Sequence, residues 1–171
     1  LPFQQWVDSF HTGYNLECIS DYMKFSKDYR YKEHLEKGFN YYVNTFFTED
    51  GIPKYYNNSI YPIDIHSPSQ LIITIIELNK TEEYKDMMDK VLSWTIKNMQ
   101  SDKGYFYYQI NKYFTSKIPY MRWSQAWMLK ALIEYCGYLE KMSSTASVIG
   151  LGERYELKLE NNRFSFERVK I

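Results

Sequence analysis

Two titratable residues stand where an apolar helix is predicted to begin. Asp64 and His66 lie two positions apart in "YPIDIHS", residues 61–67, immediately before a run of isoleucines. A carboxyl group and an imidazole can act as general acid and base when their surroundings bring their pKa values toward neutral pH. We therefore treat Asp64 and His66 as candidate catalytic residues.

Two further segments carry residues of related types. Arg122 lies in "IPYMRWSQAW", residues 118–127, and its planar guanidinium can bind a carboxylate or phosphate through two parallel hydrogen bonds. His11 and Glu17 are the first and last residues of "HTGYNLE". Inverting glycoside hydrolysis needs two carboxyl groups about 6.5–9.5 Å apart. Glu17 is the partner that we nominate for Asp64, which makes it the third candidate catalytic residue.

Each candidate also has a structural interpretation. Asp64 can cap the helix that follows it, and a histidine near a helix start, such as His66, is often structural. Glu17 can be solvated or paired with a lysine. If Arg122 is buried, it needs an anion, which is either a protein carboxylate such as Asp64 or an acidic group of a ligand. The residue types alone leave these alternatives open.

Other kinds of catalytic site find little support in the sequence. It contains three histidines and no H-x-x-x-H motif, and we expect His34 at the surface of an amphipathic helix. It also lacks the G-x-S-x-G motif of α/β-hydrolases. We predict no metal and no cofactor.

Charge, apolar runs and cysteines restrict the class of protein. Lys and Arg together number 21, as do Asp and Glu, so the overall charge gives no reason to expect nucleic acid as a partner. No apolar run reaches the roughly 18–20 residues that span a bilayer, which predicts no membrane insertion. Cys18 and Cys136 lie in helical apolar patterns without C-x-x-C spacing. We interpret both as core residues and predict a cytoplasmic protein.

The chain repeats itself with a period of 53–55 residues. "EDGIPKY" at 49–55 corresponds to "DKGYFYY" at 102–108, and Gln70 corresponds to Gln125. Each unit is predicted to be a buried helix followed by an amphipathic one. The apolar stripe of the amphipathic helix recurs 53 residues later, with Tyr31, Leu35, Phe39, Tyr42, Val43 and Phe46 matching Tyr84, Met88, Leu92, Thr95, Ile96 and Met99.

Two kinds of helix alternate in these units. Residues 68–79 and 123–135 are apolar nearly all round, so we expect protein on every side of them, whereas 31–47 and 82–99 have one apolar stripe. Inner helices surrounded by outer ones form an α/α toroid. The predicted fold class is therefore mainly all-α, with antiparallel α-hairpins forming part of a toroid. The predicted helices cover residues 14–26, 30–47, 68–79, 82–99 and 123–141.

The three motifs quoted above stand in order at the starts of inner helices. They resemble loop motifs of a bacterial family of α/α-toroid proteins that is akin to six-hairpin glycosidases and is associated with surface-polysaccharide biosynthesis. The resemblance covers about residues 8–140 and implies a polysaccharide-related role. A complete six-hairpin ring is longer than this chain, in which we recognise two hairpins and the first helix of a third. The chain thus resembles the carboxyl-terminal part of such a protein, and we expect further chain upstream of residue 1.

The last segment departs from the repeat. After Lys141 the sequence has Ser, Thr and Gly punctuation and then alternating apolar residues on either side of "ENN", which predicts a β-hairpin with a bulge. We therefore divide the chain into an α-hairpin repeat domain, residues 1–141, and a linker with a carboxyl-terminal β-hairpin extension, residues 142–171.

In a toroid, the loops that enter the inner helices meet at one end of the ring. We expect the candidate residues to line a pocket there, where helix N-termini favour anionic ligand groups. Aromatic residues make up 19% of the chain, and their flat faces suit sugar rings. The predicted substrate-binding residues are His11, Tyr14, Tyr56, Tyr61, Arg122, Trp123 and Gln125.

Two classes of function remain open. The first is a carbohydrate-active enzyme, glycoside hydrolase-like or of another kind, that acts on an acidic glycan or sugar precursor. The second is a non-catalytic glycan-binding or assembly protein that uses the same aromatic surface. In either case, the exposed apolar edge of a partial ring has to be covered by the missing part of the toroid or by another copy of the chain.

Overall fold

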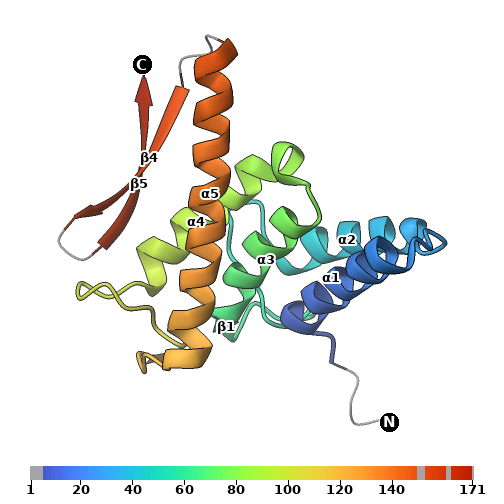
Figure 1. Ribbon diagram of the computed structural model, residues 1–171. Coiled ribbons are helices and arrows are strands. Elements are labelled where there is room, and N and C mark those ends of the chain that lie inside the picture. Colours follow the sequence, from blue (N-terminus) through green and yellow to red (C-terminus); the bar gives the residue numbers. More distant parts are fainter. Residues whose placement is uncertain (1–5, 150–152, 161–162, 171) are drawn as a thin grey trace.

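The protein is mainly helical, as predicted, in a computed structural model that describes residues 6–149, 153–160 and 163–170 (Figure 1). The α-helices are α1 (Ser9–Ser26), α2 (Lys32–Phe46), α3 (His66–Glu77), α4 (Thr81–Met99) and α5 (Ala126–Ile149), and a π-helical turn, η1 (Met121–Gln125), leads into α5. The strands are β1 (Ile63–Asp64), β2 (Gln109–Ile110), β3 (Thr115–Ser116), β4 (Glu153–Glu160) and β5 (Arg163–Lys170).

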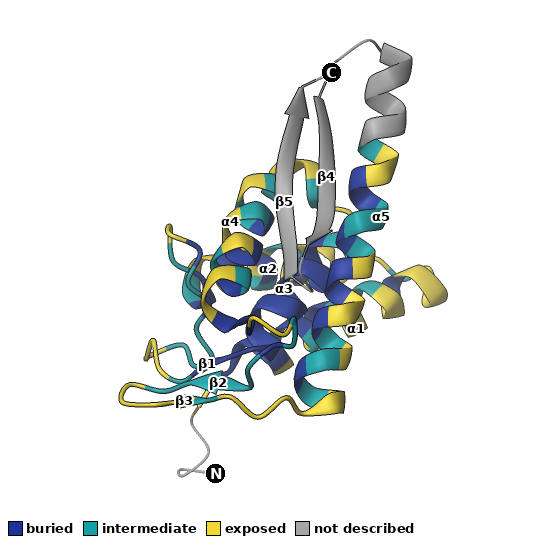
Figure 2. Cartoon of the chain, turned by 90° about the vertical axis from the view of Figure 1, so that its left-hand side faces the viewer, coloured by how far each residue is buried: buried dark blue, intermediate teal, exposed yellow. Residues whose placement is uncertain are grey.

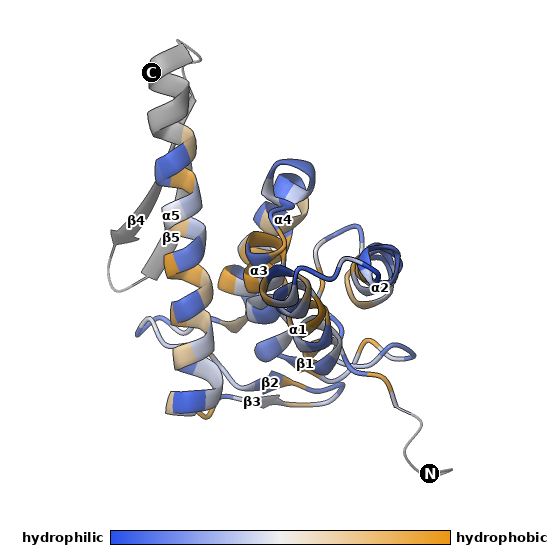
Figure 3. Cartoon of the chain, turned by 45° about the vertical axis from the view of Figure 1, so that its right-hand side comes forward, coloured by the Kyte–Doolittle hydropathy of each residue, from blue (hydrophilic) through white to orange (hydrophobic). Residues whose placement is uncertain are grey.

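The helices form two layers. The inner layer consists of α1, α3 and α5, and α3 packs against both of the others (Figure 1). In the outer layer, α2 packs against α1 and α4 packs against α3. Residues 66–75 of α3 are all buried, which agrees with the prediction of an inner helix (Figure 2). The outer helices α2 and α4 bury one apolar stripe each, and α3 carries the strongest hydrophobic colour among the helices in Figure 3.

The predicted repeat recurs in the backbone hydrogen bonds. After α2, the Gly51 N–H donates to the Thr48 carbonyl; after α4, the Gly104 N–H donates to the Ser101 carbonyl. Both glycines have positive φ angles, 80° and 87°, a conformation that glycine adopts without a steric penalty. Single β-bridges close the two turns at the same 53-residue offset, Phe47 with Pro53 and Gln100 with Phe106.

Two predicted helix ends are wrong. Helix α1 begins at Ser9 rather than near residue 14, because the Asp8 side chain caps it by accepting the N–H of His11. Helix α5 continues to Ile149 rather than ending near 141, because the residues that precede Gly150 include neither Gly nor Pro after Gly137.

Two further predictions need correction. Strands β4 and β5 form the expected antiparallel pair, but their residues match one to one from Glu153–Lys170 to Glu160–Arg163, so the predicted bulge is not there. Cys136 is half-buried, whereas Cys18 is exposed and therefore not a core residue. The face of α1 that carries Cys18 also carries the exposed residues Asn15 and Tyr22, so it lies away from the neighbouring helices.

The inner layer has one uncovered apolar side. Leu129 and Ile133 of α5 and Met121 of η1 are exposed, although the sequence predicted protein on every side of this helix. Exposed apolar surface of this kind is what a partial ring would leave. None of the helices in the described part of the chain is long and apolar enough to cross a membrane.

Candidate functional site

Asp64 is the centre of a polar network at the start of α3. Its Oδ1 accepts the backbone N–H of His66 at 2.9 Å and the indole N–H of Trp123 at 3.2 Å, and its Oδ2 accepts the side-chain amide of Gln109 at 3.1 Å. Gln109 is on β2, which pairs with β1. One carboxylate thus fastens three segments that are far apart in the sequence.

Asp64 is almost completely enclosed, with 1% of the residue's surface exposed. Burial raises its pKa above the ordinary value, while the hydrogen bonds from His66, Trp123, Gln109 and Tyr108 act in the opposite direction. Arg122 is not its partner: this side chain is exposed and forms no ion pair with any described residue. The capping interpretation of Asp64 therefore describes its contacts better than an Asp64–Arg122 ion pair does.

His66 is enclosed by aromatic rings. Its ring centroid lies 3.8 Å from that of Phe10, 4.3 Å from that of Trp123 and 4.8 Å from that of Trp127. Neither ring nitrogen has a hydrogen-bond partner among the residues that the structure describes. Burial, together with the charge of nearby His11, lowers the pKa of His66 to about 4, so the imidazole is neutral at pH 7.

The start of α1 carries a second Asp–His pair. Asp8, 56 residues before Asp64, accepts the backbone N–H of His11 at 2.8 Å, and its Oδ2 lies 2.9 Å from His11 Nδ1. The His11 side chain is 69% exposed. A hydrogen bond of 2.8 Å from the Ser9 hydroxyl to the Ser67 hydroxyl joins the two helix starts.

Tyrosines surround the two aspartates. Tyr55 and its repeat equivalent Tyr108 accept the N–H groups of Ser9 and Ile65 through their backbone carbonyls. Their rings contact those of Tyr56 and Tyr120, with centroids 4.8 and 5.1 Å apart. Burial, followed by the negative charges of the aspartates, raises the pKa of both Tyr55 and Tyr108, so both hydroxyls remain protonated at neutral pH.

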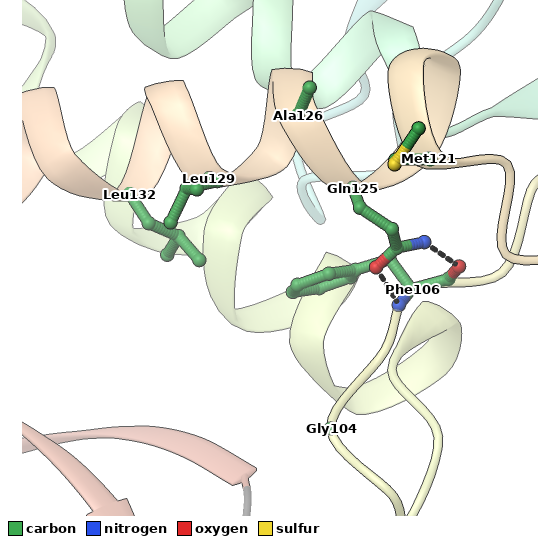
Figure 4. Close-up of a pocket in the computed structure, with 7 residues that line it drawn as sticks. All are labelled: Gly104, Phe106, Met121, Gln125, Ala126, Leu129 and Leu132. Atoms are coloured by element: carbon green, nitrogen blue, oxygen red, sulfur yellow. Dashed lines mark hydrogen bonds between the residues drawn. The ribbon is translucent and has the colours of Figure 1, made fainter.

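Other predicted ligand-binding residues have more varied positions. Tyr14 contacts Phe10 and Trp127, with ring centroids 4.3 and 5.6 Å away, and burial raises its pKa to about 12. Tyr61 is exposed and precedes a cis proline. Gln125 uses both ends of its amide on the backbone of Phe106, as the dashed lines in Figure 4 show, beside an apolar groove of about 360 Å³. The contacts of Gln125 are therefore structural.

Glu17 is not part of the Asp64 network. It accepts hydrogen bonds of 2.6 Å from both the Gln70 amide and the Thr74 hydroxyl of α3. Thr74 is eight residues after His66, so a rise of ~1.5 Å per residue puts this contact about 12 Å along α3. That separation does not suit two carboxyl groups that share one water molecule. Burial raises the pKa of Glu17, which borders a polar cleft of about 160 Å³.

The structure thus brings His11, Asp64, His66, Tyr14 and Trp123 together. The sequence analysis did not identify Asp8, Phe10, Gln109 and Trp127 as members of this group. Only Asp8 could have been recognised, because an aspartate directly before a helix is a common N-cap. In the described part of the chain, no three His, Cys, Asp or Glu side chains form a group that could hold a metal ion.

Comparisons with known proteins give no match. No protein-family model, no curated protein and no solved structure matches the chain.

Proposed function

We propose that this protein is a carbohydrate-related protein that binds an acidic glycan at the end of the helical layer where the inner helices begin. The observation that carries this proposal is Arg122, an exposed guanidinium without an ion-pair partner in the described structure. It directly precedes Trp123, whose indole is fixed by Asp64. An exposed arginine next to a tryptophan held by Asp64 suits a carboxylate or phosphate on a sugar.

Binding without turnover is favoured by the state of the two candidate catalytic groups. Asp64 is enclosed and accepts several hydrogen bonds, so a ligand in solution cannot reach its oxygens. His66 is enclosed by Phe10, Trp123 and Trp127. A general acid or base must come within hydrogen-bond reach of the reacting atom.

The enzyme remains the second candidate, and two specific features favour it. Burial raises the pKa of Asp64, and neither nitrogen of the neutral His66 ring is hydrogen-bonded within the described part of the chain. Such perturbed groups are typical of active sites. Catalysis would require the aromatic rings around His66 to move aside when substrate binds.

We also propose an arrangement for the helices. The two hairpins and α5 would belong to an α/α toroid of the kind found in six-hairpin proteins of surface-polysaccharide biosynthesis, working in the cytoplasm. The repeated turns after α2 and α4 support this arrangement, as does the uncovered face of α5. The missing part of the ring, or another copy of the chain, would cover that face.

A binding and turnover screen tests the proposed function. The protein is titrated with uronate oligosaccharides, neutral oligosaccharides and nucleotide-sugars, and each mixture is analysed for products. We expect the acidic ligands to bind and to be recovered unchanged. Product formation would favour the enzyme, and equal binding of neutral and acidic sugars would contradict the role of Arg122.

A further inference from the structure

The β2–β3 hairpin holds two aromatic side chains out in solvent beside the Asp64 network. β2 and β3 pair antiparallel, and the Asn111 N–H closes the turn by donating to the Phe114 carbonyl at 2.8 Å. Tyr113 is 86% exposed and Phe114 65% exposed. Figure 2 shows this turn in the colour of exposed residues at the edge of the molecule. Because large aromatic side chains gain free energy when buried, an ordered turn that exposes two of them indicates a contact surface.

This hairpin belongs to a long stretch of chain without acidic residues. Residues 103–133 contain no Asp or Glu, although the whole chain has as many acids as bases. Among the described residues, no ion pair within 4.0 Å involves Lys112, Lys117 or Arg122. The ammonium groups of Lys112 and Lys117 instead lie 5.3 and 5.1 Å from the ring centroids of Tyr113 and Tyr107. Lys112, Lys117 and Arg122 therefore present positive charge without an ion-pair partner in the described part of the chain, and the two lysines lie next to tyrosine rings.

The hairpin is anchored to the proposed binding site. Gln109 on β2 donates to Asp64, and Tyr108, the residue before it, contacts Tyr120, which lies two positions before Arg122. Tyr113 is four positions after Gln109. At a rise of about 3.3 Å per residue, the backbone of the tip lies at most about 13 Å from that of Gln109. A ligand that contacts Tyr113, Phe114 and Arg122 at the same time has to offer two ring faces and a separate acidic group, so it contains more than one sugar.

We propose that the β2–β3 hairpin is a second subsite, at which Tyr113 and Phe114 stack on sugar rings while Lys112 and Lys117 pair with acidic groups. The ligand is then an extended acidic polysaccharide rather than a free sugar or a nucleotide-sugar. This inference rests on the proposed function and assigns the substrate class of the same site.

A glycan fits this surface better than a nucleic acid does. Binding to nucleic acid depends on many phosphate contacts, and a chain whose 21 Lys and Arg are balanced by 21 Asp and Glu has no net positive charge to support them. Tyrosine presents a ring face together with a hydroxyl, which matches the alternating apolar and polar surfaces of a sugar. Nucleic-acid binding is one of the outcomes that the test must separate.

The test compares long and short ligands. Wild-type protein, a Tyr113→Ala/Phe114→Ala variant and a Lys112→Gln/Lys117→Gln variant are titrated with long polygalacturonate, digalacturonate, dextran and oligothymidylate. Phe25→Ala, at an 84% exposed phenylalanine at the end of α1, and Lys97→Gln, at an exposed lysine on α4, are the matched controls. Both hairpin variants should bind polygalacturonate roughly tenfold more weakly than wild type and digalacturonate equally well, while the controls bind as wild type does. The lysine variant should also show a weaker dependence of affinity on salt.

The outcomes separate the two proposals. If wild type binds both acidic ligands and the hairpin variants bind polygalacturonate unchanged, the second subsite is wrong while the proposed function stands. If wild type binds neither acidic ligand, the proposed function fails and the subsite fails with it. If the protein binds oligothymidylate more tightly than polygalacturonate and the hairpin variants lose this binding, the surface binds nucleic acid instead. If dextran binds as tightly as polygalacturonate, the proposed pairing of the lysines with acidic groups is wrong.

Discussion

The two inner helices α1 and α3 begin with the same pair of residue types in opposite surroundings. At the start of α1, the ring of His11 is exposed and lies within hydrogen-bond distance of Asp8. At the start of α3, Asp64 accepts the backbone N–H of His66 but does not contact its ring nitrogens, which have no hydrogen-bond partner among the described residues. The same residue types therefore form a surface pair in one unit and a buried network in the other.

The number of neighbouring helices explains this difference. Helix α3 has α1 on one side and α5 on the other, so Phe10 covers His66 from one direction and Trp123 and Trp127 from the other. In the described part of the chain, α1 has an inner helix on one side only. Because the Asp64 network is buried, removing one of its hydrogen bonds should lower the free energy of unfolding more than removing the exposed pair at the start of α1.

The largest expected effect comes from the two aspartates. Asp64→Asn replaces one buried acceptor oxygen by a donor that faces other donors, so the free energy of unfolding should fall by about 2–4 kcal/mol. Asp8→Asn is the matched control, since asparagine is as good an N-cap as aspartate, and should lower it by less than about 1 kcal/mol. Urea unfolding at pH 7 measures both. Equal effects would show that the two pairs do not differ as described.

The second prediction uses pH to isolate the enclosed imidazole. The pKa of His66 falls from 6.5 in the unfolded chain to about 4 in the folded protein, so below pH 6.5 the unfolded state binds more protons. Stability from this group is complete above pH 6.5 and declines as pH falls toward 4, by about 3 kcal/mol in all. The raised pKa values of Asp64 and Glu17 act with the opposite sign, since they destabilise the folded state as pH rises above their unfolded values.

A His66→Phe variant separates these contributions. It removes the histidine titration and keeps a ring of similar size, so its stability at pH 7 should lie within about 1.5 kcal/mol of wild type. Urea unfolding between pH 7 and pH 4.5 should show wild type losing stability relative to His66→Phe as the pH falls. A constant difference between the two proteins would mean that the imidazole is hydrated or hydrogen-bonded in solution.

The smallest effect is expected at Glu17. Glu17→Gln keeps an oxygen that can accept from Thr74 and Gln70 and removes a half-buried charge, so stability at pH 7 should change by less than about 1 kcal/mol. Glycan binding should be unchanged, because this side chain lies about 12 Å along α3 from the Asp64 network. Isothermal titration alongside urea unfolding checks both expectations. A loss of binding at unchanged stability would return Glu17 to the site.

The sequence could predict those features that depend on local periodicity. Helical spacing and the 53-residue offset located the helices and both turns because neighbouring residues determine them. The start of α1 was missed because Asp8 caps the helix without an apolar run before it. The toroid itself stays a prediction.

The candidate site was predicted less well, because its contacts join distant residues. Asp64 and His66 were identified by type and position, but the donor from Gln109 depends on a two-residue strand that no local pattern indicates. The enclosure of His66 depends on Phe10, 56 residues earlier in the chain. Packing of this kind is set by the fold as a whole, which is why the sequence could not tell a solvent-facing pair from a buried one.

The central claim is that Arg122 binds the ligand, whereas Asp64 stabilises the fold. Arg122→Gln, Arg122→Lys and Asp64→Asn are compared with wild type by urea unfolding and by titration with an acidic oligosaccharide. Arg122→Gln should bind about ten- to a hundredfold more weakly with unchanged stability, and Arg122→Lys should restore part of the affinity because an ammonium lacks the planar fork. Asp64→Asn should lower stability while the folded fraction still binds. Large destabilisation by Arg122→Gln with unchanged affinity would contradict the account.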